Sequence, residues 1–90
     1  MLMVEIDPDK KKPLYEQIYE EIKRQIQVGT LPEKTKLPSA RALAKRLEIS
    51  RNTVDLAYGQ LTAEGYIESR PRSGYYVCMV EDLAALDIQV

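Results

Sequence analysis

Apolar residues recur at helical spacing in the first third of the chain. Between Pro13 and Gly29, an apolar residue occurs every fourth position and charged or polar residues fill the gaps. This spacing is typical of a helix with one apolar face. Proline is well tolerated in a first helical turn, and glycine is a common residue just after a helix end. The pattern therefore predicts a first helix between these two residues. Its apolar positions are Leu14, Ile18, Ile22 and Ile26.

Two shorter apolar stripes follow an irregular connector over residues 30–38, which Leu31 and Leu37 are expected to anchor to the core. The stripes occupy positions 40, 43, 44 and 47, and then 54, 57, 58 and 61. Ser39 and Ser50 precede them, and serine is a favoured N-cap. We predict a helix of about two turns after Ser39, a tight turn at residues 48–49, and a third helix over residues 51–64 that Gly65 ends.

After residue 65 the pattern changes from helix to strand. Residues 66–69 and 75–80 are rich in β-formers, and residues 70–74 have turn chemistry. They predict one β-hairpin with a basic tip. The predicted fold class is α+β: a winged helix-turn-helix, three helices followed by a two-stranded β-wing. Residues 1–12 are expected to form an N-terminal arm, residues 13–80 the domain, and residues 81–90 a tail or the start of a linker to an absent effector domain.

Composition narrows the classes of function. The 90 residues fit one small domain. No apolar run reaches the roughly 18 residues of a membrane span, and the N-terminus does not resemble a secretory signal, so we expect a cytoplasmic protein. The chain has no histidine and one cysteine, Cys78, which is expected to be a strand residue without chemistry. Zinc ligands and the commonest general base are therefore missing, although carboxylate or lysine chemistry stays open.

The net charge of −1 is unevenly distributed. Residues 36–74 carry seven Lys/Arg against four Asp/Glu, whereas the segments before and after them have an acidic excess. A basic middle between acidic ends fits a local phosphate-binding face.

Two short helices joined by a tight turn form a helix-turn-helix, in which the second helix can enter the major groove of DNA. The first turn of the third predicted helix contains Ser50, Arg51, Asn52 and Thr53. Arginine can bind guanine and asparagine can bind adenine, each through two hydrogen bonds, and Asp55 could accept one from cytosine. The complete set of candidate DNA-binding residues is Ser39, Arg41, Ser50, Arg51, Asn52, Thr53, Asp55, Tyr58, Arg70, Arg72, Ser73 and Gly74.

Each candidate also has a plain structural explanation. Ser39 and Ser50 can simply cap helices, and Arg41 can pair with a nearby carboxylate. Exposed charges such as those at positions 55, 70 and 72 are usually only solvated. Tyr58 lies on the apolar stripe and is mainly a core residue. Tyr15 and Tyr19 are expected in the core or an interface, and residues 10–12 in a solvated arm.

These motifs resemble the N-terminal DNA-binding domain of the GntR family of bacterial transcription regulators. The resemblance covers about residues 13–78. It depends on Pro13-Leu14-Tyr15, Leu37-Pro38-Ser39-Ala40-Arg41, Ser50-Arg51-Asn52-Thr53-Val54, Ala57-Tyr58 and Ser73-Gly74 in combination. The MocR-type subfamily is the most similar, and the YtrA-type subfamily comes next.

The resemblance implies operator binding, often by dimers, with Arg41, Arg51, Thr53 and the wing at Gly74 near DNA. For MocR-type proteins it also implies a linker and an aminotransferase-like domain that binds pyridoxal phosphate. We expect no cofactor or effector site in this chain, which would then be a fragment. The family usually has glycine at three positions where this chain has Lys34, Glu48 and Arg72. The first two predict slightly different turns, and Arg72 brings the usual wing geometry into question.

Two other classes of function remain open. Winged helices also act as protein-docking modules, and this reading predicts an apolar or acidic face on the third helix. An enzyme or cofactor-binding unit would need a phosphate-binding glycine loop or a catalytic pair, and neither is evident in the sequence.

Overall fold

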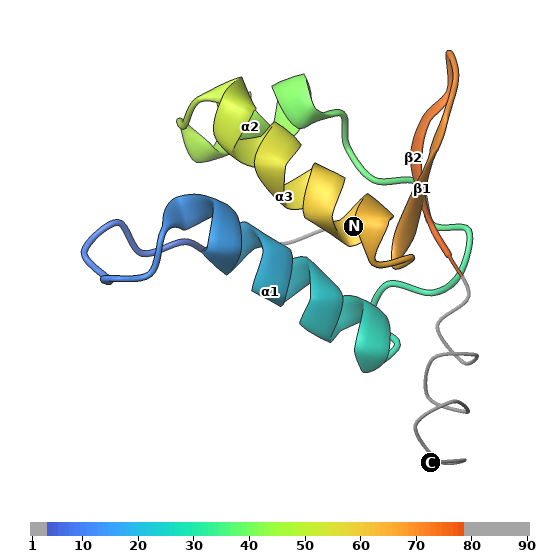
Figure 1. The fold of residues 1–90 in the computed structure, drawn as a ribbon, viewed down its shortest axis with the longest axis horizontal. Coiled ribbons are helices and arrows are strands. Elements are labelled where there is room, and N and C mark those ends of the chain that lie inside the picture. The colour runs from blue at the N-terminus through green and yellow to red at the C-terminus, as the bar shows by residue number, and fades with distance from the viewer. Residues whose placement is uncertain (1–3, 79–90) are drawn as a thin grey trace.

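The computed structural model describes residues 4–78 and has an α+β architecture. Helices α1 and α2 both pack on α3, and the hairpin projects beyond the C-terminal end of α3 (Figure 1). The predicted winged helix-turn-helix is confirmed. Residues 79–80, predicted as the end of the second strand, and the predicted tail at residues 81–90 lie outside the described part. The elements are α1 (Leu14–Gln27), α2 (Ala40–Leu47), α3 (Arg51–Ala63), β1 (Ile67–Arg70) and β2 (Gly74–Val77).

Both predicted serine caps are present. The Ser39 hydroxyl accepts a hydrogen bond from the N–H of Ala42 at 3.0 Å, and the Ser50 hydroxyl accepts one from the N–H of Thr53 at 3.2 Å. Each serine thus satisfies a donor that the first helical turn leaves without a partner. The helix starts could be predicted because this chemistry is local.

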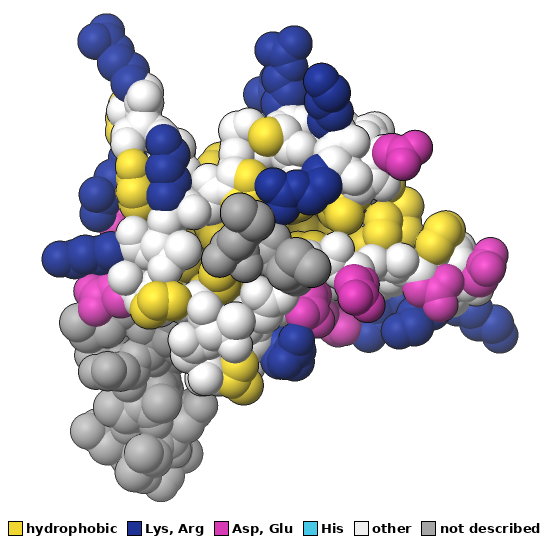
Figure 2. Space-filling view, turned by 180° about the vertical axis from the view of Figure 1, so that it is seen from behind, with side chains coloured by type: hydrophobic (Ala, Val, Ile, Leu, Met, Phe, Trp, Pro, Cys, Tyr) yellow, Lys and Arg dark blue, Asp and Glu magenta, His cyan; other side chains and the backbone are white. Residues whose placement is uncertain are grey.

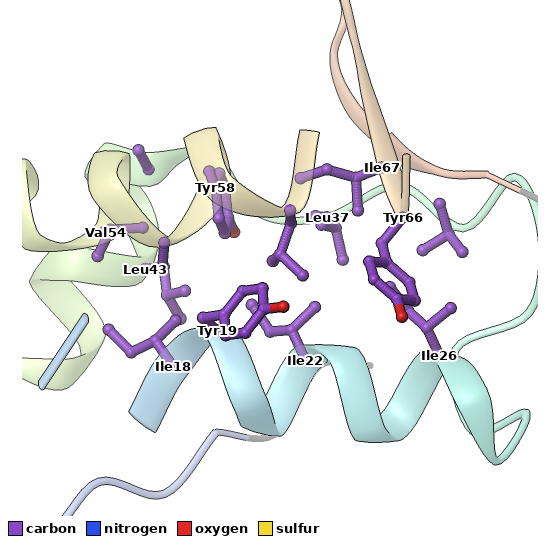
Figure 3. Packing of buried hydrophobic residues seen from close by; sticks show 14 of the residues in the cluster. Ile18, Tyr19, Ile22, Ile26, Leu37, Leu43, Val54, Tyr58, Tyr66 and Ile67 are labelled. Atoms are coloured by element: carbon purple, nitrogen blue, oxygen red, sulfur yellow. The ribbon is translucent and has the colours of Figure 1, made fainter. Parts of the chain in front are cut away.

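The core is formed by the apolar stripes of the three helices. Side chains from α1, including Ile18 and Ile22, point toward α3 and the base of the wing (Figure 3). Leu31 and Leu37 are both buried, so the connector is anchored as predicted. Among the described helices, none is long and apolar enough to cross a membrane.

The connector also pairs with the edge of β2 through an isolated β-bridge, which the sequence did not reveal. Lys36 forms an antiparallel bridge with Tyr76 of β2. On either side, the N–H of Lys34 donates to the Val77 carbonyl at 2.8 Å, and the N–H of Leu37 donates to the Tyr75 carbonyl at 2.9 Å. The base of the wing is therefore fixed to the segment that leads into α2.

The N-terminal arm is attached to α1 and is not simply solvated. The buried Gln17 amide donates to the carbonyls of Asp7 and Lys12, at 3.0 and 2.9 Å, and accepts from the Asp7 N–H at 2.7 Å. Val4 and Ile6 pack against the core. The lysines at positions 10–12, predicted to be solvated, are exposed, although the Lys12 ammonium also forms an ion pair with Glu20 at 2.5 Å.

The three positions where family members usually have glycine keep a left-handed backbone. Lys34, Glu48 and Arg72 have φ values of 71°, 58° and 66°. At the end of α2, the N–H of Ile49 donates to the Ala44 carbonyl at 3.0 Å, as in the usual glycine-terminated helix end. The prediction that the turns at Lys34 and Glu48 differ is therefore wrong for the backbone conformation, because both residues adopt the positive φ that glycine favours.

A polar link joins the middle of α1 to the end of α3. The Tyr19 hydroxyl donates a hydrogen bond to the Glu64 carboxylate, and the Lys23 ammonium donates one to the Tyr19 oxygen at 3.3 Å. The hydrogen bond from Tyr19 lowers the pKa of Glu64. Burial and the same carboxylate raise the pKa of Tyr19, so it remains a donor. As predicted, Tyr19 belongs to the core.

Candidate nucleic-acid interface

The first turn of α3 is the centre of the candidate interface. Arg51 and Asn52 are exposed, whereas Thr53 is half-buried. The hydroxyls of Ser50 and Thr53 lie 3.0 Å apart and share a hydrogen bond. The backbone N–H groups and positive dipole end of a helix N-terminus attract anions such as phosphate. The turn therefore combines an exposed guanidinium, an exposed amide and a favourable local field.

Arg51 and Asp55 form an ion pair on the exposed side of α3. The Arg51 Nε and the Asp55 Oδ2 are 3.6 Å apart, and 66% and 44% of the two side chains are exposed. Exposed pairs of this kind contribute little to stability, typically about 0.3–0.5 kcal/mol within a helix. Arg51 can therefore exchange Asp55 for a stronger ligand at little cost.

Helix α2 supplies one exposed cation near its start. Arg41 is exposed, and within the described residues it forms no ion pair. The alternative that Arg41 simply pairs with a nearby carboxylate is therefore not supported. Ser39, two residues earlier, is exposed, with its hydroxyl engaged in the cap.

The wing presents two arginines in different settings. The Arg70 guanidinium lies 3.2 Å from a Glu68 oxygen and 4.5 Å from the centre of the Tyr76 ring, so it is held along the hairpin. Arg72 occupies the turn, is exposed, and has no ion pair within residues 4–78. Ser73 is exposed and shares a hydrogen bond with the Tyr76 hydroxyl.

The wing turn has two features of a type II turn. The N–H of Ser73 donates to the Arg70 carbonyl at 3.0 Å, with Pro71 second and Arg72 third in the turn. This turn type accepts proline at the second position and needs a positive φ at the third. Gly74 follows with a φ of 125°, and a Cβ there would lie 3.4 Å from the Lys36 side chain.

Tyr58 does not belong to this surface. It is 0% exposed, its hydroxyl donates to the Pro38 carbonyl at 2.8 Å, and its ring meets that of Tyr75 edge-on. Its predicted contact with a phosphate is therefore wrong, because the hydroxyl is already bonded inside the domain. The reading of Tyr58 as a core residue is correct.

Basic side chains project from one edge of the molecule, and further ones lie among acidic side chains near the opposite edge (Figure 2). Figure 2 shows Lys and Arg side chains projecting from the wing and from the helical part at the same edge, while most visible Asp and Glu side chains lie nearer the opposite edge. Lys36, which belongs to the predicted irregular connector, is exposed, and its side chain lies beside Gly74. No local signal marked it, because its position depends on pairing with a strand 40 residues later.

Comparison with known proteins decides the family. The sequence profile described as "Bacterial regulatory proteins, gntR family" matches residues 14–77. The chain belongs to the GntR family. It is the winged DNA-binding domain of this family of transcription regulators.

The relatives include both expected subfamilies. The chain is 44% identical over 75 residues to the probable rhizopine catabolism regulatory protein MocR of Rhizobium meliloti. It is 40% identical over 75 residues to the transcriptional repressor YtrA of Bacillus subtilis. The matches cover 83% of this chain in both cases, but 15% of MocR and 58% of YtrA. The chain thus spans only a small part of MocR's length.

Solved structures of relatives have the same fold. The GntR-family transcription factor YtrA from Sulfolobus acidocaldarius superimposes with a TM-score of 0.79 at 35% identity, covering 96% of this chain and 93% of that one. The DNA-binding domain of AraR, in complex with operator ORX1, gives a TM-score of 0.73 at 29% identity, covering 86% and 96%.

Proposed function

We propose that this domain binds a double-stranded DNA operator, with α3 in the major groove and the wing on the backbone or minor groove. The observation that carries this proposal is the exposed polar first turn of α3, with exposed arginines at the start of α2 and in the wing turn, in a GntR-family fold. The AraR relative, solved with an operator, supports the same kind of partner. In this arrangement α3 reads bases, while α2 and the wing hold phosphates.

The roles of the residues follow from their settings. Arg51 and Asn52 are exposed at the start of α3 and have the donors for guanine and adenine edges. Asp55 accepts from cytosine but repels phosphate, so it contributes specificity more than affinity. Arg41, Arg70 and Arg72 contact phosphates.

The setting of the domain is a further part of the proposal. We further propose, on the family resemblance, that the regulator works in the cytoplasm and binds its operator as a homodimer. Residues 81–90 are then a tail or the start of a linker to an effector domain. A pyridoxal phosphate site would belong to that other domain. Every described lysine here is exposed or half-buried, whereas cofactor sites are concave and mostly enclosed.

Salt-dependent binding tests the proposal directly. Fluorescence anisotropy of a labelled random-sequence duplex should show affinity that falls steeply with salt, because each phosphate contact adds about one unit to the logarithmic slope. Arg41→Ala should lower that slope by about one. Arg24→Ala removes the same charge from α1, where the arginine pairs with Glu21, and should leave it unchanged. No binding even at low salt would favour the protein-docking reading.

A further inference from the structure

The exposed face of α3 continues past its charged first turn into an apolar part. Asn52, Asp55, Leu56 and Gly59 follow one another at positions i, i+3, i+4 and i+7, and all four are exposed. Residues at this spacing lie on one side of a helix. The far half of that side therefore presents a leucine and a bare stretch of backbone.

Leu56 is not part of the hydrophobic core. Its exposed fraction is 55%, and among the large hydrophobic residues at positions 4–78 only Val28 is similarly exposed. One exposed leucine on a surface is ordinary. Its position four residues after Asn52, on the face assigned to base reading, is what distinguishes it.

Gly59 lacks an explanation inside the chain. It lies in the interior of α3 and is not among the residues with positive φ. Among residues 4–78, no atom would lie within 4 Å of a Cβ built there. Glycine inside a helix destabilises it by roughly 0.5–1 kcal/mol relative to alanine. Neither backbone geometry nor packing within the domain requires this residue, which suggests that a partner approaches the helix there.

We infer that Leu56 contacts the C5-methyl group of a thymine in the operator, and that DNA approaches the α3 backbone closely at Gly59. The inference rests on the proposed function and extends it to the base that this face selects. Thymine is the only base with a methyl group in the major groove, and apolar side chains recognise it there. Arg51, which pairs with Asp55 on this side of α3, matches the charge of a duplex.

The first test removes the thymine methyl and nothing else. Duplexes are selected from a randomised library with the unaltered domain, and each thymine of a selected duplex is then replaced by deoxyuridine. One replacement should weaken binding about fourfold, the expected effect of losing one buried methyl-sized group. The same base replacement should leave the affinity of the Leu56→Ala variant for that duplex unchanged. Val28→Ala, which shortens the other exposed apolar side chain, should respond as the unaltered domain does.

The second test separates stability from binding at Gly59. Gly59→Ala should raise the melting temperature by about 2–8 °C. It should also weaken binding to the selected duplex at least about fivefold, because the added methyl group meets DNA in a close-packed contact. A higher melting temperature with unchanged affinity would overturn the close approach.

The remaining outcomes are also decisive. If the unaltered domain binds no duplex, the proposed function fails. If it binds, but each deoxyuridine replacement affects Leu56→Ala and the unaltered domain equally, only the thymine contact fails. If Gly59→Ala changes self-association without DNA and leaves affinity intact, this face is a protein interface and the inference is wrong.

Discussion

Arg51 and Asp55 stand one helical turn apart on the exposed side of α3, with their charged groups 3.6 Å from each other. The carboxylate holds the guanidinium at the face that we assign to base reading. It also repels the phosphates of any approaching duplex. Asp55 therefore lowers the affinity for any duplex while it positions Arg51 for base reading. Substitutions of Arg51 and of Asp55 should consequently change DNA binding in different ways.

Removal of the Arg51 side chain should weaken binding to a selected duplex by roughly 1–3 kcal/mol, the usual value of a bidentate base contact. The loss on random DNA should be smaller. Anisotropy titrations on both duplexes measure the difference, with Arg24→Ala as the control of equal charge. An equal loss on both duplexes would assign Arg51 to a phosphate.

Asp55→Asn should have the opposite effect on random DNA. The substitution removes a negative charge from the DNA-facing side of α3 and releases Arg51, so affinity for a random duplex should rise a few-fold while discrimination between duplexes falls. Glu16→Gln removes a charge of the same sign from the first turn of α1 and should change neither quantity. Unchanged discrimination in Asp55→Asn would exclude Asp55 from base reading.

Arg72→Gly should make the domain more stable and its binding less salt-dependent. Arg72 holds a φ of 66°, a conformation that costs a residue with a side chain roughly 1–2 kcal/mol and glycine almost nothing. Loss of the charge should lower the salt slope by about one. Thermal unfolding and salt titration measure the two effects. Glu48→Gly relieves the same backbone conformation without removing a cation, so it should raise stability and leave the slope unreduced.

Tyr58→Phe should destabilise the domain without affecting DNA contacts. The lost hydrogen bond to the Pro38 carbonyl should cost about 1 kcal/mol, equivalent to a fall of about 4–8 °C in melting temperature for a domain of this size. Affinity measured well below that temperature should not change. A change in salt slope would restore Tyr58 to the interface.

The Tyr19–Glu64 link should make stability sensitive to acid. The hydrogen bond from Tyr19 lowers the pKa of Glu64 in the folded state. The link therefore stabilises the domain fully above the unfolded-state pKa of this carboxyl group, and the stabilisation is lost as pH falls through the lower, folded-state pKa.

Tyr19→Phe should consequently flatten the loss of stability on acidification. Urea unfolding from neutral pH down to the acidic range measures the slope. Tyr66→Phe is a suitable control, since the Tyr66 hydroxyl accepts from Gln27 and contacts no carboxylate among the described residues. Equal slopes for Tyr19→Phe and the unaltered domain would show that the link does not affect stability.

Much of the candidate interface could be predicted from local chemistry. The serine caps at positions 39 and 50 mark the starts of α2 and α3, and Gly65 marks the end of α3, because each acts on backbone groups within a few residues. Asn52, Asp55 and Leu56 do not belong to the apolar stripe at positions 54, 57, 58 and 61, and all three are exposed. The surface of α3 was therefore readable from the sequence before any tertiary contact was known.

The predictions that were wrong concern residues whose conformation or hydrogen bonding depends on contacts between distant segments. The sequence places Tyr58 on the apolar stripe of α3. Only the tertiary structure shows that its hydroxyl donates to the Pro38 carbonyl and that its ring packs on Tyr75. The left-handed backbone angles of Lys34, Glu48 and Arg72 could not be predicted either, because residues with a side chain rarely adopt them.

The sequence by itself determined the three helices, their caps, the hairpin and the basic character of its tip, because periodicity and capping act over one or two turns of chain. Only the tertiary structure decided how these parts combine. The pairing of residues 34–37 with β2 fixes the wing against the start of α2, and the Gln17 hydrogen bonds attach the arm to α1. Such contacts join residues that lie five to 43 positions apart, and their partners are chosen by the packing of the whole core.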